Sequence, residues 1–210
     1  MFVSSSVKRD LQPIENYLMT HQLDLNRYRA RVGVGRTVCF GCVYKRNGVY
    51  AESRQGWRHP ELYHLLLEYA KKHVKIQWDA IQVNQNYLAQ KHRDENNWGL
   101  SHIVACGDYK GGDLCMESSG GVIRENIRYR PVEFCGGKRT HWTGEWTGNR
   151  FSIVFFATDF KPKTIIDCTE YHPYYDGALW WLLRNEGFGK WAKIDRKGYT
   201  VGILDEEKID

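Results

Sequence analysis

Short strand-like segments separated by glycine-containing turns occupy residues 78–157, and this pattern constrains the fold more than any other feature of the chain. Many short strands at close spacing are typical of a jelly roll or another two-sheet β-barrel. We therefore predict a mostly β fold with flanking helices, a double-stranded β-helix whose core spans residues 78–157. The expected strands are residues 78–88, 101–106, 114–116, 122–124, 129–135 and 151–157, with a tight turn at 108–112.

The flanking segments favour helices and one hairpin. Pro60 can open a helix that runs to His73, because Leu62 and Leu66 recur at helical spacing. The other expected elements are a helix at 10–21, a hairpin of strands 37–44 and 49–52, and a helix at 177–185 that packs on the outside of the barrel. With no internal repeat or linker, we predict one domain over residues 1–210: a helical and β support (1–77), the barrel core (78–157) and a C-terminal extension (158–210).

Composition excludes several classes of protein. Of the 210 residues, 42% are hydrophobic and 26% charged, values that do not fit a disordered chain. The longest apolar stretch, Phe151–Ala157, is too short to span a membrane, and no signal peptide opens the chain. We expect a soluble, intracellular protein, cytoplasmic or nuclear, with no membrane partner.

The charge pattern is compatible with nucleic acid. Outside the acidic tail, residues 1–204 hold 29 basic and 21 acidic residues, a net charge of +8. The chain also has 29 aromatic residues, which can stack on bases. Surface charge for solubility and aromatic residues for a core explain the same numbers equally well.

The six cysteines do not form a compact disulfide pattern, so we expect them to be reduced. Cys39-Phe40-Gly41-Cys42 could begin a zinc site, but no second Cys or His pair completes it. Packing within a strand is the favoured interpretation of this pair.

A cluster of possible metal ligands lies between two expected strands. His92 and Asp94 are two residues apart, so on an extended backbone both side chains project from the same face. His141 supplies a second imidazole 47 residues after Asp94. Two histidines and one carboxylate form the facial triad that binds non-haem Fe(II) and leaves positions open. A zinc site could use the same three ligands.

Arg150-Phe151-Ser152 favours the iron interpretation. A hairpin at 143–148 would bring Arg150 beside His141, and Arg150 and Ser152 would share a face. An arginine inside a barrel needs a partner, because an unpaired buried charge is costly. The sequence offers no obvious acid for this role. A ligand carboxylate, which suits the planar guanidinium fork, is the natural candidate.

Together these residues resemble the Fe(II)- and 2-oxoglutarate-dependent dioxygenase superfamily, whose fold is the double-stranded β-helix. The resemblance implies that His92, Asp94 and His141 bind iron and that an oxygen molecule reacts there. It implies that Arg150 and Ser152 bind the distal carboxylate of 2-oxoglutarate. Asn84, Asn86 or Tyr87 would support this co-substrate or line the pocket.

Two further segments resemble the branch of TET and J-base thymine hydroxylases and its viral and algal relatives. They are Val83–Asn97, which contains the His-x-Asp pair, and Gly107–Leu114. This branch oxidises the 5-methyl group of thymine or 5-methylcytosine in DNA. The same function is therefore expected here, with Lys138, Arg139 and Arg93 as candidate phosphate contacts.

Two other functions stay open at this point. The first is a dioxygenase that acts on a free amino acid, a peptide or another small metabolite. The second is a non-catalytic jelly-roll binding module.

Overall fold

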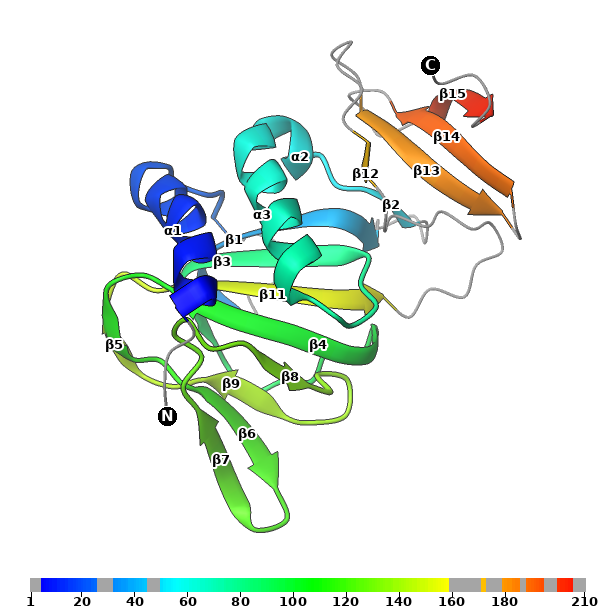
Figure 1. Cartoon of the computed structure of the whole chain (residues 1–210). Coiled ribbons are helices and arrows are strands. Elements are labelled where there is room, and N and C mark those ends of the chain that lie inside the picture. Colours follow the sequence, from blue (N-terminus) through cyan, green and yellow to red (C-terminus); the bar gives the residue numbers. More distant parts are fainter. Residues whose placement is uncertain are drawn as a thin grey trace.

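The structure, a computed structural model, describes residues 5–25, 32–44, 50–158, 171–172, 179–185, 188–194 and 200–205. Its core is a six-stranded sheet in the order β2-β1-β3-β11-β4-β8, with smaller sheets β7-β6-β9 and β10-β5. The fold is the expected jelly roll with flanking helices (Figure 1). The core strands are β1 Gly33–Tyr44, β2 Tyr50–Glu52, β3 Ala80–Ala89, β4 Asn97–Cys106, β5 Tyr109–Gly111, β6 Leu114–Ser118, β7 Gly121–Glu125, β8 Val132–Phe134, β9 His141–Thr143, β10 Trp146–Gly148 and β11 Phe151–Thr158.

Helices α1 (Ser5–Thr20) and α3 (Pro60–His73) cover one face of the six-stranded sheet, with the short α2 (Gln55–Arg58) before α3 (Figure 1). The predicted bounds of α3 are confirmed, with Pro60 in its first turn, where the missing N–H costs nothing. Helix α1 begins five residues before the predicted Asp10. The reason is that Val7 continues the buried stripe of Leu11, Ile14 and Leu18 by one turn.

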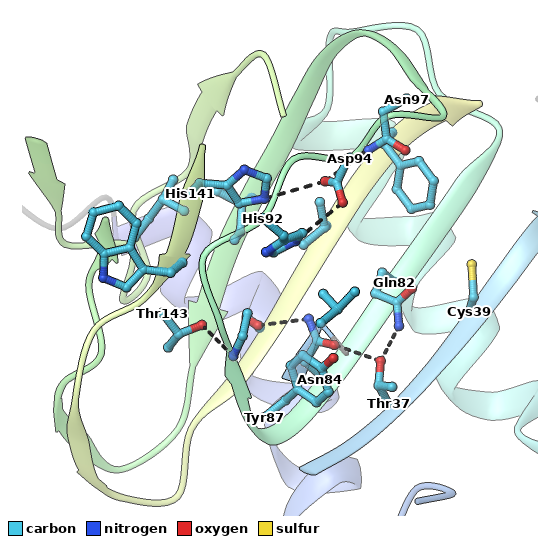
Figure 2. Close-up of a pocket in the computed structure, with 18 of the residues that line it drawn as sticks. Thr37, Cys39, Gln82, Asn84, Tyr87, His92, Asp94, Asn97, His141 and Thr143 are labelled. Carbon is cyan, nitrogen blue, oxygen red and sulfur yellow. Dashed lines mark hydrogen bonds and ion pairs between the residues drawn. The ribbon is translucent and has the colours of Figure 1, made fainter. Parts of the chain in front are cut away.

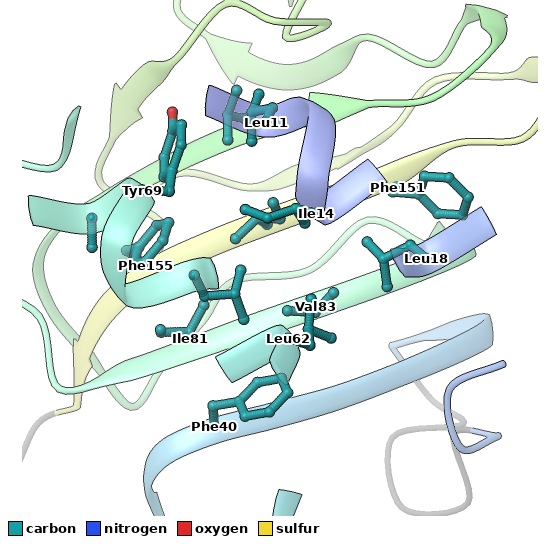
Figure 3. Packing of buried hydrophobic residues seen from close by; sticks show 14 of the residues in the cluster. Leu11, Ile14, Leu18, Phe40, Leu62, Tyr69, Ile81, Val83, Phe151 and Phe155 are labelled. Carbon is teal, nitrogen blue, oxygen red and sulfur yellow. The ribbon is translucent and has the colours of Figure 1, made fainter. Parts of the chain in front are cut away.

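Alternate side chains of the central strand β11 point to opposite faces of the six-stranded sheet, one packed against the helices and the other lining a cavity. Phe151, Ile153 and Phe155 are almost fully buried against the helices (Figure 3), and each contributes about 1.5–3 kcal/mol of burial free energy. Ser152 and Val154 point to the other face, where they line a cavity. Because β3 and β11 pair in register, Gln82 and Asn84 line the same cavity.

A second apolar cluster lies on the cavity side of the sheet and packs the two small sheets against it. Its members include Ile103, Ala105, Leu114, Met116 and Phe134. These residues come from strands β4, β6 and β8. They fill one part of the space between the sheets and leave the rest open for the site.

Several sequence predictions are corrected by the backbone. Tyr109–Gly111 is a strand paired with β10, rather than part of a tight turn. The strand expected at 129–135 is limited to Val132–Phe134, because Tyr129 has a left-handed φ of 54° that interrupts extended backbone. The predicted hairpin of 37–44 with 49–52 is confirmed by the pairing of β1 with β2, although residues 45–49 lie outside the described residues.

The helix expected at 177–185 is also wrong. Leu179–Asn185 is strand β13 of a four-stranded antiparallel sheet β12-β13-β14-β15, with β12 Tyr171–His172, β14 Phe188–Ile194 and β15 Thr200–Asp205. Tryptophan and leucine suit either structure, and pairing with β14 along the whole strand decides it. Among the described residues, no helix has the length and apolar character needed to cross a membrane.

Candidate metal centre and adjoining cavity

A cavity of about 330 Å³ lies on the inner face of the six-stranded sheet (Figure 2). His92, Asp94 and His141 line it at one wall, while Arg150 and Ser152 line it from the start of β11. The structure therefore brings together the two groups of residues that the sequence singled out.

The three candidate ligands converge. Their ligand atoms all lie within 4.8 Å of one another. His92 Nε2 is 3.4 Å from Asp94 Oδ1, and His141 Nε2 is 3.5 Å from Asp94 Oδ2. This is the only such group of three or more potential ligands among the described residues.

The backbone holds the two imidazoles side by side. His92 and His141 form an antiparallel bridge, with the His92 N–H donating to His141 O at 3.1 Å and the reverse bond at 2.9 Å. Each Nδ1 lies near a carbonyl oxygen, that of Gln90 at 2.7 Å and that of Arg139 at 2.9 Å. A carbonyl only accepts, so each Nδ1 carries the proton. Both Nε2 lone pairs are thereby left for a metal ion.

Asp94 is fixed by two neighbouring turns. Its N–H donates to Gly136 O at 3.0 Å, and Asn97 Nδ2 donates to Asp94 Oδ2 at 3.2 Å. Burial raises the pKa of this carboxyl, but before a metal ion binds, His141 and His92 in their protonated forms outweigh burial through their hydrogen bonds and charges and hold the pKa well below its usual range. Asp94 is therefore an anion at neutral pH.

Gly136 leaves room for this carboxylate, since a Cβ there would lie 2.9 Å from Asp94 Oδ2. Sequence reasoning missed both Gly136 and Asn97. Asn97 lies at the end of the segment that resembles the TET branch but was given no role there, and the contact of both residues with Asp94 depends on how the 135–139 turn folds onto residues 94–97.

These donors fit a divalent transition metal. Two neutral imidazoles and one carboxylate match the ligand set of non-haem Fe(II) sites, and the cavity beside them gives room for further ligands. Cys39 and Cys42 also line the cavity, but they join no metal-ligand group among the described residues.

Arg150 is the most unusual charge in the cavity, because its side chain is 2% exposed and pairs with no carboxylate within 4 Å among the described residues. Its Nε donates to Gly112 O at 3.0 Å. Burial lowers the pKa of Arg150, yet a guanidinium stays protonated at any physiological pH. A buried cation of this kind favours an anionic ligand.

Two aromatic rings orient this guanidinium. Its central carbon is 5.7 Å from the ring of Tyr109 and 5.8 Å from that of Trp146. Burial raises the pKa of Tyr109 to about 12, so this ring carries a neutral hydroxyl. The sequence did not indicate that either residue contacts Arg150, because the pairing of β5 with β10 that brings them together joins distant segments.

The route by which Arg150 reaches the cavity differs from the prediction. β9 pairs with β6 and β10 with β5, so residues 143–148 do not form a hairpin between β9 and β10. Instead, Asn86 fastens the backbone of Arg150: Asn86 Oδ1 accepts from Arg150 N at 2.8 Å, and Asn86 N donates to Arg150 O at 2.8 Å. Asn86 itself is exposed and does not line the cavity, whereas Asn84 and Tyr87 do.

The candidate phosphate contacts are close to the metal ligands in the sequence. Arg93, Lys138 and Arg139 are all exposed. Arg93 lies between His92 and Asp94, with its Nε 3.3 Å from Thr140 Oγ1. Lys138 and Arg139 belong to the turn before His141. We refer to these three exposed cations, which are close to the metal ligands in sequence but do not line the cavity, as the rim.

Comparisons with known proteins find similarity to solved structures alone. No family model matches the sequence, and no curated protein matches it. NgTET1, solved in complex with 5mC DNA, superposes with a TM-score of 0.51 at 12% identity, over 74% of this chain and 68% of its own. A prolyl-4-hydroxylase from Pseudomonas putida has a TM-score of 0.45 at 13% identity, over 74% of this chain and 88% of its own. A prolyl hydroxylase from Trichoplax adhaerens, solved with a hypoxia inducible factor peptide, has a TM-score of 0.47 at 12% identity, over 75% and 80%. The likeness to NgTET1 shows a shared fold.

Proposed function

We propose that this chain is an Fe(II)- and 2-oxoglutarate-dependent dioxygenase that hydroxylates a C–H bond. The supporting observation is one cavity that holds both the His92, Asp94 and His141 group and a buried arginine without a carboxylate partner among the described residues. A zinc site would account for the first feature but would leave the arginine unexplained. The fold that the chain shares with NgTET1 is compatible with this activity.

Each residue has a distinct role in this proposal. His92, Asp94 and His141 hold Fe(II), and the bound iron, with 2-oxoglutarate and O₂, supplies the oxidising chemistry. Arg150 binds the distal carboxylate through its two-pronged fork, which fixes the co-substrate's direction relative to the metal ligands. The rings of Tyr109 and Trp146 keep the guanidinium in place. Because Arg150 and Ser152 are almost fully buried, a carboxylate bound to them would be shielded from bulk water.

For the substrate, we propose the 5-methyl group of a pyrimidine base in nucleic acid. The cations Arg93, Lys138 and Arg139 are exposed and are within three residues of a candidate metal ligand in the sequence, and exposed cations of this kind can contact the phosphates that flank a base. A base in a duplex must be flipped out to reach such a recessed site. The solved complex of NgTET1 holds 5mC DNA on the same fold.

The direct test is mass spectrometry of nucleosides after methylated and unmethylated DNA is incubated with the protein, Fe(II), 2-oxoglutarate and ascorbate. We expect a hydroxymethyl pyrimidine and an equivalent amount of succinate. A free amino acid, peptide or metabolite that is converted faster than any DNA or RNA oligomer would overturn the substrate. Failure of the anaerobically purified protein to bind iron would favour a binding module instead.

A second test addresses the rim. Replacing Lys138 and Arg139 with Glu should weaken DNA binding for all sequences and reduce its salt dependence, because fewer counterions are released. Lys71 and Lys75, exposed on and just after helix α3, provide a control with the same charge change. Equal losses in both double variants would show that overall charge, rather than this rim, attracts the nucleic acid.

A further inference from the structure

Four polar side chains form a continuous row of hydrogen bonds along the inner face of the sheet. Thr37 (β1), Asn84 (β3) and Ser152 (β11) lie directly opposite one another on three adjacent strands. Gln82, two residues before Asn84 on β3, completes the row. Figure 2 shows Gln82, Thr37 and Asn84 joined in this way on the cavity wall.

The hydrogen bonds in this row run in one direction, from Gln82 to Ser152. Gln82 Nε2 donates to Thr37 Oγ1. The Thr37 hydroxyl has two possible acceptors, and Asn84 Oδ1 at 2.7 Å is closer than the Val83 carbonyl at 3.3 Å. Asn84 Nδ2 then donates to Ser152 Oγ at 3.2 Å.

This direction determines what Ser152 can do. Its oxygen already accepts a hydrogen bond from Asn84, so the hydroxyl proton is available as a donor. Ser152 is 3% exposed, and it lines the same cavity as Arg150, which precedes it by two residues just before β11. A hydroxyl donor beside a buried guanidinium favours an anion, and hydrogen bonds in a chain polarise one another.

We propose that Gln82, Thr37 and Asn84 form a directional hydrogen-bond chain that holds the Ser152 hydroxyl as a donor to the carboxylate bound by Arg150. Thr37 is thus a positioning residue for this carboxylate, although it lies one strand beyond Asn84 and two strands from Ser152. The assignment rests on the proposed function, since it takes the carboxylate to be that of 2-oxoglutarate.

The experiment measures 2-oxoglutarate binding by isothermal titration calorimetry in Mn(II)-loaded protein under anaerobic conditions, so that no turnover is needed. Thr37→Val keeps the shape of the side chain and removes its hydroxyl. We expect the dissociation constant to rise about threefold to tenfold, the effect of one net hydrogen bond. Thr37→Ser restores the hydroxyl and should restore affinity. Gln82→Leu should have a smaller effect than Thr37→Val, because Thr37 keeps its own proton.

Two controls separate positioning from a general structural effect. Thr158→Val removes a hydroxyl from the far end of the same cavity, where Thr158 donates to Asp79 Oδ2 at 2.8 Å, and it should leave 2-oxoglutarate affinity unchanged. In a Ser152→Ala background, Thr37→Val should not change the 2-oxoglutarate dissociation constant further, because the hydrogen-bond chain no longer ends in a hydroxyl donor.

The outcomes distinguish the proposed hydrogen-bond chain from the proposed dioxygenase function on which it rests. If wild-type protein fails to bind 2-oxoglutarate, both are wrong. If wild-type protein binds it and Ser152→Ala weakens binding while Thr37→Val and Gln82→Leu do not, the chain is wrong and the function stands. Additive effects of Thr37→Val and Ser152→Ala would also overturn the chain. If Thr37→Val does not fold, the test uses Gln82→Leu, whose smaller loss of 2-oxoglutarate affinity should likewise disappear in the Ser152→Ala background.

Discussion

The substitution Arg150→Lys tests the proposed co-substrate site most sharply, because it keeps the charge and removes the fork. A lysine ammonium is a single point donor and cannot make two parallel hydrogen bonds to one carboxylate. The loss of one charge-assisted bond is worth about 1.5–3 kcal/mol, which corresponds to about a 10- to 150-fold rise in the dissociation constant for 2-oxoglutarate. Calorimetry with Mn(II)-loaded protein measures this change directly.

The same substitution also removes the Nε donor to Gly112 O, and the loss of that bond can destabilise the fold by about 1–3 kcal/mol. Thermal denaturation of the variant therefore accompanies the titration. Arg124→Lys, at an exposed arginine on β7, is the matched control and should change neither quantity by much. A folded Arg150→Lys protein that binds 2-oxoglutarate within threefold of wild type would refute the role of Arg150.

Three further predictions concern the metal ligands, their support and the sheet. His92→Ala, Asp94→Ala and His141→Ala should each lower Fe(II) affinity and abolish 2-oxoglutarate turnover while circular dichroism stays unchanged; a variant with near-wild-type turnover would remove its residue from the ligand set. Gly136→Ala should weaken Fe(II) binding, since the new Cβ would crowd Asp94 Oδ2 at 2.9 Å, whereas Gly120→Ala meets nothing within 4 Å and should not. Burial, with a smaller contribution from the charge of His73, lowers the pKa of His102 to about 4. As the pH falls, His102 is therefore protonated in the unfolded chain before it is protonated in the folded one. The free energy of unfolding should decrease by about 3 kcal/mol between pH 6.5 and 4. Denaturant titrations of His102→Leu should show a smaller decrease over the same range.

The parts of the fold that the sequence predicted depend on local patterns. Helix α3 follows from a proline, an apolar stripe and basic residues in the last turn, all within residues 60–73. Strand β11 follows from an apolar run that needs no information from elsewhere. The helix expected at 177–185 failed because Leu179–Asn185 has no local signal that distinguishes helix from strand, and its pairing with β14 determines the result.

The candidate site divides in the same way. His92 and Asp94 could be placed together because residues two apart on an extended chain share a face, and His141 and Arg150 followed from the chemistry such a pair needs. Asn97 and Gly136, which shape the position of Asp94, could not be predicted, because their contacts depend on two turns that meet only in the folded chain. Tyr109 and Trp146 are hidden for the same reason.

Strand β11 contributes both to the hydrophobic core and to the candidate site. Alternate residues of one extended segment serve the two purposes: Phe151, Ile153 and Phe155 anchor the strand under the helices, and the residues between them face the cavity. A substitution on the helix side therefore changes stability first, and one on the cavity side changes the site first. Ser152 lies between two almost fully buried side chains, which hold in place the backbone that carries its hydroxyl. A rigid sheet position of this kind suits a donor that must meet a carboxylate in one fixed direction.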